Sequence, residues 1–335
     1  MTAAARNTKN RKIGTSAASA EELSRKLGLE SKLGHDGSFS AAAASLFPYR
    51  APQSFIDRMA KGDPRDPLLL QVLPVEEETR PAAGFVPDPL EEKEASPVSG
   101  VLHKYSGRAL LLVSGVCAIH CRYCFRRHFP YAEHELTGAR LDAALDYLRH
   151  DESITEVILS GGDPLSASDD YLSRLCDRLA AIPHLEWLRV HSRVPIVLPR
   201  RIDGRMIDWL TRTRLKPVMV VHCNHPAEID DAVIQGLARL RAAGVPLFNQ
   251  AVLLRGVNDS ADTLCALSRS LFAAGVTPYY LHLLDPVEGV AHFEVPIEEA
   301  RALVREVTDR LPGYLVPKLV RELAGEGAKV GLEAG

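Results

Sequence analysis

Short apolar, β-branched runs alternate with longer amphipathic stretches from Ala109 onward. The short runs predict strands over residues 109–115, 155–161, 185–192, 217–223, 247–254 and 278–285. Between and after them, apolar residues recur at helical spacing over 141–150, 169–182, 205–213, 230–244, 261–275 and 298–311. Several of these stretches end in the Ala-Gly or Pro that is typical of a helix stop. The pattern therefore indicates repeated strand–helix units.

Units of this kind predict an α/β fold with a parallel sheet, because consecutive strands are joined by right-handed helical crossovers. Six of them form either an open sheet or a curved, incomplete barrel. Residues 21–100 differ, since short helical patterns such as AEELSRKLGLE are separated by proline-bearing links such as GDPRDP. We expect an N-terminal helical and extended segment over 21–100 that wraps a core over 101–313. Residues 314–335 then form a C-terminal segment.

Composition limits the class of protein. The 335 residues are 46% apolar, which is enough for a real core, and the net charge of −3 hides no strongly basic or acidic half. Charge therefore predicts neither a nucleic-acid nor a membrane partner. Residues 1–20 are basic and rich in small residues with no apolar stretch after them, so we expect a disordered tail. No run of about eighteen apolar residues could span a bilayer. We expect a cytoplasmic protein with reduced thiols, where clustered cysteines bind metal more often than they form disulfides.

Cys117, Cys121 and Cys124 form a C-x3-C-x2-C pattern directly after the first predicted strand. Loops at the carboxyl ends of parallel strands often carry functional residues. Three thiolates on one short loop suit a cubane iron–sulfur cluster, and because such a cluster takes four ligands, one iron would stay open. The alternative is a structural zinc site completed by His120 or His128, although zinc commonly uses paired C-x2-C motifs.

Positive charge surrounds the third cysteine, on Arg122, Arg126, Arg127 and His128. Such a run is often only a solvated face, but arginine forks are well suited to carboxylate and phosphate, so we expect an anionic ligand beside the cysteines. Near the end of the chain, Lys329 follows two glycines in GEGAK. A lysine of this kind is either a flexible surface residue or, in an environment that removes its proton, the site of a Schiff base.

The cysteine spacing resembles that of the radical S-adenosylmethionine superfamily, and SGGDP at 160–164 is similar to its glycine-rich turn for the cofactor's amino group. More narrowly, CRYCFRRHFPYA, SRVPIVLPRRI, NHPAEI, GVPLFNQAVLLRGVND, PYYLHLLD and GYLVPK resemble blocks of the lysine 2,3-aminomutases over roughly residues 50 to 330. The resemblance is strongest to the subgroup that provides β-lysine for elongation factor P. The usual fold of the superfamily, a partial six-stranded (β/α) barrel, agrees with the six predicted strands.

The resemblance implies three cofactors and residues for each. Cys117, Cys121 and Cys124 would hold a [4Fe–4S] cluster. S-adenosylmethionine would bind the open iron and Tyr123, Ser160, Gly161, Gly162, Asp163, Ser192, Arg193, Asn249 and Gln250. Pyridoxal 5′-phosphate would form a Schiff base with Lys329, and Lys104 and Arg108 would bind its phosphate. Arg126 would pair with the carboxylate of the substrate, and Asp285 and Glu322 with its ε-ammonium.

The chain departs from the zinc-binding lysine aminomutases at several positions. Those enzymes have aspartate at Glu322, a zinc-ligating cysteine at Ser260 and tyrosine at His282. The cysteine-rich extension that supplies their other zinc ligands has no counterpart here, so we expect no zinc site. The longer side chain of Glu322 leaves its contact with the ε-ammonium less secure than that of Asp285.

The activity implied is the conversion of L-α-lysine to (R)-β-lysine by a 5′-deoxyadenosyl radical, driven by an external one-electron reductant. The product would then be attached to elongation factor P by a partner lysine ligase. One alternative is an aminomutase for glutamate or arginine, although the carboxylate pair Asp285 and Glu322 suits a cationic side chain better. The other is a non-catalytic metal-binding adaptor, which would take up no iron–sulfur cluster.

Overall fold

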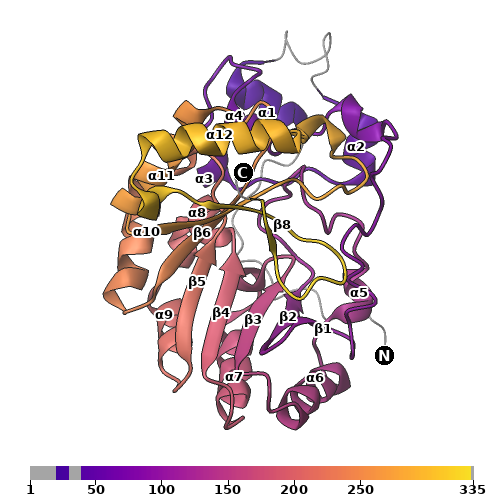
Figure 1. Ribbon diagram of the computed structural model, residues 1–335, viewed down its shortest axis with the longest axis vertical. Coiled ribbons are helices and arrows are strands. Elements are labelled where there is room, and N and C mark those ends of the chain that lie inside the picture. The colour runs from indigo at the N-terminus through magenta and orange to yellow at the C-terminus, as the bar shows by residue number, and fades with distance from the viewer. Residues whose placement is uncertain (1–19, 30–38, 333–335) are drawn as a thin grey trace.

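The computed structural model describes residues 20–29 and 39–332. The expected disordered tail, residues 1–20, lies outside the described residues except for Ala20. Within the described part of the chain, one nine-stranded sheet has its strands in chain order (Figure 1). The strands are β1 (Val101–Tyr105), β2 (Arg108–Ser114), β3 (Glu156–Gly161), β4 (Trp187–Ser192), β5 (Lys216–Val221), β6 (Leu247–Val252), β7 (Thr277–His282), β8 (Lys318–Arg321) and β9 (Val330–Gly331).

Strands β2 to β8 are parallel, whereas β1 and β9 pair antiparallel at the two ends. The two end strands do not pair with each other, so the sheet is an open, partial barrel. The six predicted strands are confirmed as β2 to β7. The predicted crossover helices are confirmed as α6 (Ala139–His150), α7 (Asp169–Ala180), α9 (Gly204–Thr211), α10 (Asp231–Ala242), α11 (Ala261–Ala273) and α12 (Ile297–Arg310).

The remaining helices are short. They are α1 (Ala20–Leu27), α2 (Ala41–Leu46), α3 (Gln53–Ile56), α4 (Pro67–Leu70), α5 (Tyr131–His134) and α8 (Val194–Val197), with 3-10 turns η2 (Glu76–Thr79), η3 (Pro164–Ser166), η4 (Pro199–Arg201), η5 (Pro226–Glu228), η6 (Ala291–Phe293) and η7 (Gly313–Leu315). Figure 1 shows α1 to α4 gathered with α12 at the end of the sheet to which β3 to β5 point. The N-terminal segment therefore covers the end of the sheet at which the loops after the parallel strands lie.

Side-chain caps set the beginnings of four crossover helices. Ser168, Asp203, Asp230 and Ser260 each accept a hydrogen bond from a backbone N–H three residues ahead. A cap satisfies one of the unpaired amides of the first turn and typically contributes about 1 kcal/mol. Ser260 thus serves to begin α11.

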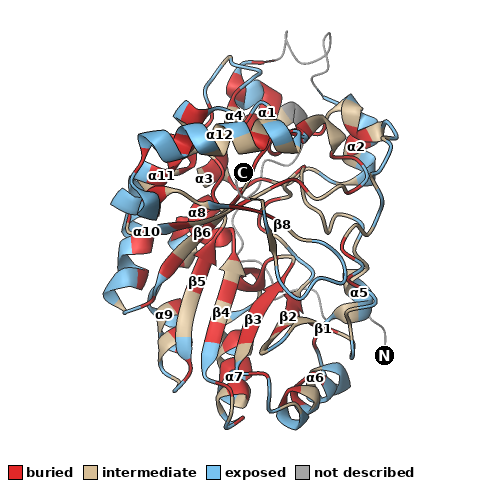
Figure 2. Cartoon of the chain, in the orientation of Figure 1, coloured by how far each residue is buried: buried red, intermediate tan, exposed pale blue. Residues whose placement is uncertain are grey.

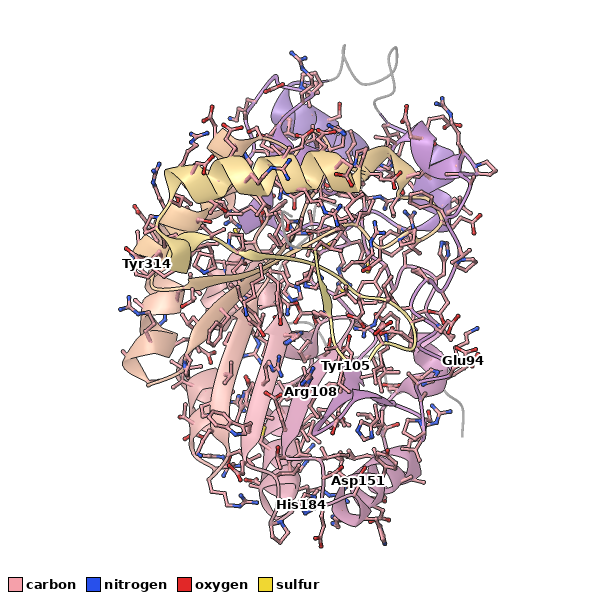
Figure 3. The ribbon with its side chains drawn as sticks, viewed as in Figure 1. Glu94, Tyr105, Arg108, Asp151, His184 and Tyr314 are labelled. Atoms are coloured by element: carbon pink, nitrogen blue, oxygen red, sulfur yellow. The ribbon has the colours of Figure 1, made fainter. Side chains whose placement is uncertain are left out.

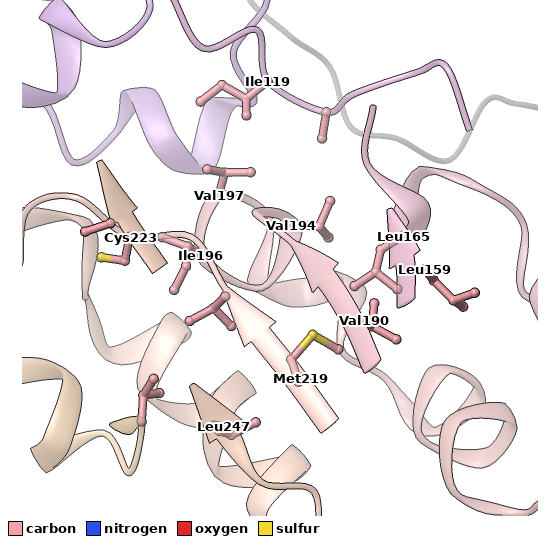
Figure 4. Close-up of a cluster of buried hydrophobic side chains, with 14 of the residues drawn as sticks. Ile119, Leu159, Leu165, Val190, Val194, Ile196, Val197, Met219, Cys223 and Leu247 are labelled. Atoms are coloured by element: carbon pink, nitrogen blue, oxygen red, sulfur yellow. The ribbon is translucent and has the colours of Figure 1, made fainter. Parts of the chain in front are cut away.

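The period-two alternation of the strands decides which side chains face the core. On β6, Leu247, Asn249 and Ala251 are buried, whereas the residues between them are partly exposed on the opposite face. Figure 2 shows burial running along the strands and exposure on the outer sides of the helices. The core cluster of Figure 4 includes Leu159, Leu165, Val190, Val194, Ile196, Met219 and Leu247. The other face of the same strands is left to line a cavity.

Among the described residues, none of the helices combines the length and the apolar character required to cross a bilayer.

Candidate active site

A cavity of about 620 Å³ lies inside the partial barrel. Of the site residues predicted from the sequence, all but Asn249 line it: Lys104, Arg108, Cys117, Cys121, Tyr123, Cys124, Arg126, Ser160, Gly161, Gly162, Asp163, Ser192, Arg193, Gln250, Asp285, Glu322 and Lys329. These residues are spread between Lys104 and Lys329, on strands and on the loops that follow them. The fold therefore brings the predicted set together.

Asn249 does not join this set, because it lies on the core face of β6. Its amide group donates to the carbonyl of Cys223 at 3.0 Å, and its side-chain oxygen accepts from the Cys223 N–H at 2.9 Å. Gln250, one residue further on, faces the cavity instead. Side chains alternate between the two faces of a strand, and on β6 this places Gln250 toward the cavity and Asn249 toward the core. Asn249 thus holds the end of β5 in place and does not line the cavity.

The three cysteines lie on one loop between β2 and α5. Burial raises the pKa of Cys117 well above its ordinary value, and the neighbouring Cys124 adds to this effect. Burial together with Cys121 likewise raises the pKa of Cys124 to about 11. The neighbouring thiols thus disfavour ionisation of Cys117 and Cys124, which indicates that the sulfurs lie close together. Metal binding would relieve this repulsion, because iron binds the thiolate form.

Glycines allow the loop after β3 to approach the cysteine loop closely. A side chain at Gly162 would lie 3.0 Å from the sulfur of Cys117, and one at Gly161 would lie 2.5 Å from the carbonyl oxygen of Ser114. Gly161 also has a φ of 123°, a conformation that other residues rarely adopt. Asp163 follows and accepts hydrogen bonds from Ser192 Oγ and from the Arg193 N–H, which joins this turn to the end of β4. Burial raises the pKa of Asp163 to about 6.

No three histidine, cysteine or acidic side chains within the described ranges converge on a position for a single metal ion. A cubane cluster does not require such convergence, because each cysteine binds a different iron. The two histidines that could have completed a zinc site bond to carbonyl groups instead. His120 Nδ1 lies 2.7 Å from the Pro48 oxygen, and His128 Nε2 lies 3.2 Å from the Glu288 oxygen.

Not all arginines of the basic cluster beside the cysteines are free to bind a ligand in the cavity. Arg122 is fully buried and forms a two-bond pair with Glu78, and Arg127 bonds the same carboxylate at 2.7 Å. These two arginines therefore fasten the cysteine loop to the N-terminal segment. The expectation of an anionic ligand beside the cysteines then rests on Arg126 and Arg193.

A chain of alternating charges crosses one side of the cavity. Glu92 accepts two hydrogen bonds from Arg126, at 2.6 and 2.7 Å, and one from Lys104 at 3.3 Å. Lys104 also donates to Glu322 at 3.0 Å, and Lys329 donates to Glu322 at 2.7 Å. Burial opposes ionisation of Glu322, but Lys329 and Lys104 outweigh it and lower its pKa to about 2. Both carboxylates of this charge network, Glu92 and Glu322, thus have cationic partners.

Glu92 is a site residue that the sequence did not reveal. It lies in a proline-bearing link between patterned elements, and its side chain is only 3% exposed. Its pKa is lowered, because the neighbouring Arg126 outweighs the cost of burial. In the sequence Glu92 lies between Glu91 and Lys93 and outside any repeating pattern, and neither feature predicts a buried ion pair.

Asp285 differs from these paired carboxylates. Its Oδ1 atom is buried and has no hydrogen-bond partner among the described residues. Burial, with a further contribution from Glu322, raises its pKa to about 7. A buried polar atom without a partner is costly, so its retention beside a cavity indicates a position for a ligand. A carboxylate beside Glu322 and Lys329 favours a cation there.

A second group of unpartnered atoms lines the cavity on four successive strand ends. The side-chain nitrogens His191 Nε2, His222 Nε2, Gln250 Nε2 and His282 Nε2 are buried without partners in the described structure. Burial lowers the pKa of His222 to about 4 and keeps the other two imidazoles neutral as well. The cavity therefore offers neutral hydrogen-bonding groups on this side and charged groups on the other. Alternation along the predicted strands could have identified this wall.

At the opposite edge of the sheet, the β1–β2 hairpin supplies Lys104, Tyr105 and Arg108. The guanidinium carbon of Arg108 lies 4.7 Å from the ring centroid of Tyr105, and the two residues are labelled in Figure 3. The hairpin closes through Gly107, whose φ of 79° suits a two-residue turn. Tyr123 lies in the cysteine loop, where its hydroxyl accepts from Asn224 at 2.7 Å.

Comparison with known proteins agrees with this geometry. The Radical SAM superfamily model matches residues 111–212. The L-lysine 2,3-aminomutase of Escherichia coli is 53% identical, over 87% of this chain and 85% of that protein. The L-lysine 2,3-aminomutase of Haemophilus influenzae is 50% identical, over 87% of this chain and 86% of that protein. The enzyme of the same name from Clostridium subterminale is 38% identical, over 82% of this chain and 66% of that protein. The chain belongs to the lysine 2,3-aminomutase family of radical S-adenosylmethionine enzymes. It is therefore an isomerase of the radical class.

Membership of this family implies a [4Fe–4S] cluster and S-adenosylmethionine. The residues present fit both groups, since three adjacent thiols line the cavity and the glycine turn at 161–162 approaches them closely. The predicted ligand positions thus coincide with the one part of the cavity wall that carries sulfur.

Proposed function

We propose that this enzyme converts L-α-lysine to (R)-β-lysine, with pyridoxal 5′-phosphate bound through Lys329. The observation that carries the proposal is the buried, unpartnered oxygen of Asp285 beside Glu322 and Lys329. The pair of carboxylates suits an ammonium group at the far end of a substrate. Neither glutamate, which would repel them, nor the longer guanidinium of arginine suits the pair as well.

The cofactors would share the chemistry. When bound, the cluster with S-adenosylmethionine supplies a radical able to break an unactivated C–H bond, and pyridoxal phosphate carries the amino group between adjacent carbons. The protein contributes position and the exclusion of water. Cys117, Cys121 and Cys124 would hold the cluster, and the wall formed by Ser160–Asp163, Ser192, Arg193 and Gln250 would hold the adenosyl cofactor.

Lys104 and Arg108 would bind the phosphate of pyridoxal phosphate. Both lie on the β1–β2 hairpin and line the cavity, and Arg108 has no carboxylate partner among the described contacts. Lys329 is only 19% exposed, and its Nζ atom donates to Glu322 Oε2 at 2.7 Å. Loading of the cofactor would engage Lys329 and Lys104 and leave Glu322 free for the ammonium group of lysine.

Arg126 would bind the carboxylate of the substrate. Two of its nitrogens, Nε and Nη2, are held by Glu92, whereas Nη1 makes only 3.3 Å contacts with Ser160 Oγ and the Gly161 oxygen. The Nη1 edge of Arg126 is therefore the part of the guanidinium most readily available to a ligand. Binding at both ends of lysine would hold C3 at a fixed place, which is how binding energy lowers the barrier of the reaction.

The β-lysine formed would be attached to elongation factor P by a lysine ligase, with an external one-electron donor reducing the cluster. This assignment is supported by the resemblance of the cysteine block and of residues 52–74 to the subgroup with that role. A test is anaerobic reconstitution of the purified protein with iron and sulfide, followed by lysine, S-adenosylmethionine, pyridoxal phosphate and a strong reductant.

We expect β-lysine by chiral chromatography from the unaltered protein and from Asp208→Asn, an exposed control on α9. Asp285→Asn should load the cluster and pyridoxal phosphate but form no β-lysine. A β-isomer from glutamate or arginine in place of lysine would contradict the proposed substrate. A failure to take up iron would contradict the proposed class of reaction.

A further inference from the structure

Arg193 makes a contact with a cysteine sulfur that binding of a ligand does not explain. It lies immediately before α8, and its side chain is 5% exposed. Its Nη1 lies 2.7 Å from Cys121 Sγ, and its Nη2 donates to Gln71 Oε1 at 2.6 Å and to Glu228 Oε2 at 3.1 Å. The guanidinium thus spans the cysteine loop, the N-terminal segment and η5.

This guanidinium is fixed on its faces as well as on its edges. Its central carbon lies 5.4 Å from the ring centroid of Phe55 and 5.6 Å from that of Tyr123. Glu228 is itself fully buried and held by the amide of Gln71 and by the Asn224 N–H. Because each partner is immobilised, Arg193 cannot turn away from Cys121 without breaking a buried network. The position of Nη1 beside the sulfur is therefore imposed by the protein.

We propose that Arg193 donates an N–H···S hydrogen bond to the Cys121 thiolate of the bound cluster and thereby raises the reduction potential of that cluster. The inference rests on the proposed function, which makes Cys121 a cluster ligand. Hydrogen bonds to ligand sulfurs and nearby positive charge stabilise the more negative, reduced state of an iron–sulfur cluster. A one-electron donor can then reduce the cluster more readily.

This role is separate from contact with S-adenosylmethionine. Arg193 Nε is buried and has no partner among the described residues, so it stays available for the carboxylate of that cofactor. The bond from Nη1 to the sulfur would exist whether or not the cofactor is present. The inference can therefore be tested without S-adenosylmethionine and without turnover.

The test is an anaerobic redox titration, followed by electron paramagnetic resonance, of the reconstituted full-length protein without S-adenosylmethionine. Arg193→Gln should lower the midpoint potential. Arg193→Lys should lower it less, because lysine keeps the positive charge but lacks the branched guanidinium group that spans the sulfur and Gln71. Arg201→Gln should leave the potential unchanged, since this arginine pairs with Asp169 and is not in the cavity wall. Resonance Raman spectra should show a deuterium shift of the Fe–S(Cys) bands that Arg193→Gln removes.

Equal midpoint potentials in Arg193→Gln and Arg201→Gln would overturn the inference, as would a deuterium shift that survives in Arg193→Gln. Should Arg193→Gln fail to hold a cluster, Gln71→Met retains the arginine but removes one of the two acceptors that orient Nη2. We expect it to lower the potential and weaken the deuterium shift, and unchanged values would again refute the role. If the unaltered protein itself binds no cluster, the proposed function fails instead.

Discussion

Replacing Asp285 with asparagine should stabilise the ligand-free protein and remove the affinity of the cofactor-loaded protein for lysine. The carboxylate has a buried oxygen with no partner among the described residues, and burial raises its pKa from 3.8 to about 7. A charge in this position is retained for function at the expense of stability. The asparagine side chain has the same shape and carries no charge, so it removes the electrostatic cost and leaves the packing unchanged.

The size of the effect follows from the shift in pKa. A change from 3.8 to about 7 corresponds to about 4 kcal/mol above pH 7, at about 1.4 kcal/mol for each tenfold change in proton affinity. Because the effective dielectric constant around buried groups usually makes such electrostatic costs smaller than this upper value, we expect about 2 to 4 kcal/mol. Between pH 4 and pH 7 the folded protein binds the proton that the unfolded chain has released. The contribution of this group to stability therefore falls as pH rises through that range.

Thermal unfolding at pH 5 and pH 8 measures this effect. At pH 8 Asp285→Asn should melt several degrees above the unaltered protein, and the difference should be smaller at pH 5. Asp208→Asn, with a side chain 71% exposed, should change the melting temperature little at either pH. A variant that melts below the unaltered protein at pH 8, or that binds lysine with unchanged affinity in calorimetry once loaded with pyridoxal phosphate, would refute the reasoning.

Three further changes test other parts of the site. Cys121→Ala should abolish cluster loading, measured as iron and sulfide content, and normal iron content would contradict its role as a ligand. Lys329→Ala should keep the cluster but lose the absorbance of covalently bound pyridoxal phosphate, and retained absorbance would assign the cofactor to another lysine. Gly161→Ala should lower the free energy of unfolding by about 2 kcal/mol or more, because of its positive φ and its approach to the Ser114 carbonyl. Gly204→Ala, which has open space around it, is the matched control and should be nearly neutral.

The barrel could be predicted from the sequence because the signals for its strands and helices are local. Each strand from β2 to β7 is a short apolar run, and each crossover helix carries its own apolar stripe and, in four cases, its own cap. Strand β1 was missed, since VLHKY has no alternating pattern and is held by pairing with β2. The two C-terminal strands are too short to show a period and depend on the edge that β7 offers.

The site was predicted less completely, for two physical reasons. Alternation along β6 separates Gln250 from Asn249, and a family resemblance by blocks does not distinguish neighbours within a strand. Arg126 and Arg193 each have a partner in the N-terminal segment, at Glu92 and Gln71 respectively. Contacts between residues so far apart in the chain depend on how that segment packs, and no local pattern encodes them.

The charges of the cavity indicate that its cationic side chains would exchange a carboxylate partner for a ligand when the ligand binds. Lys104, Arg126 and Lys329 are proposed to bind anionic or electrophilic groups, yet each already has a carboxylate partner in the ligand-free structure. Buried cations without partners would cost several kcal/mol each, so the fold supplies Glu92 and Glu322 as internal counterions. Under the proposed function, pyridoxal phosphate would engage Lys104 and Lys329 and release Glu322, and the released carboxylate would join Asp285. The proposed site for the ammonium group would thus be completed only after the cofactor is in place.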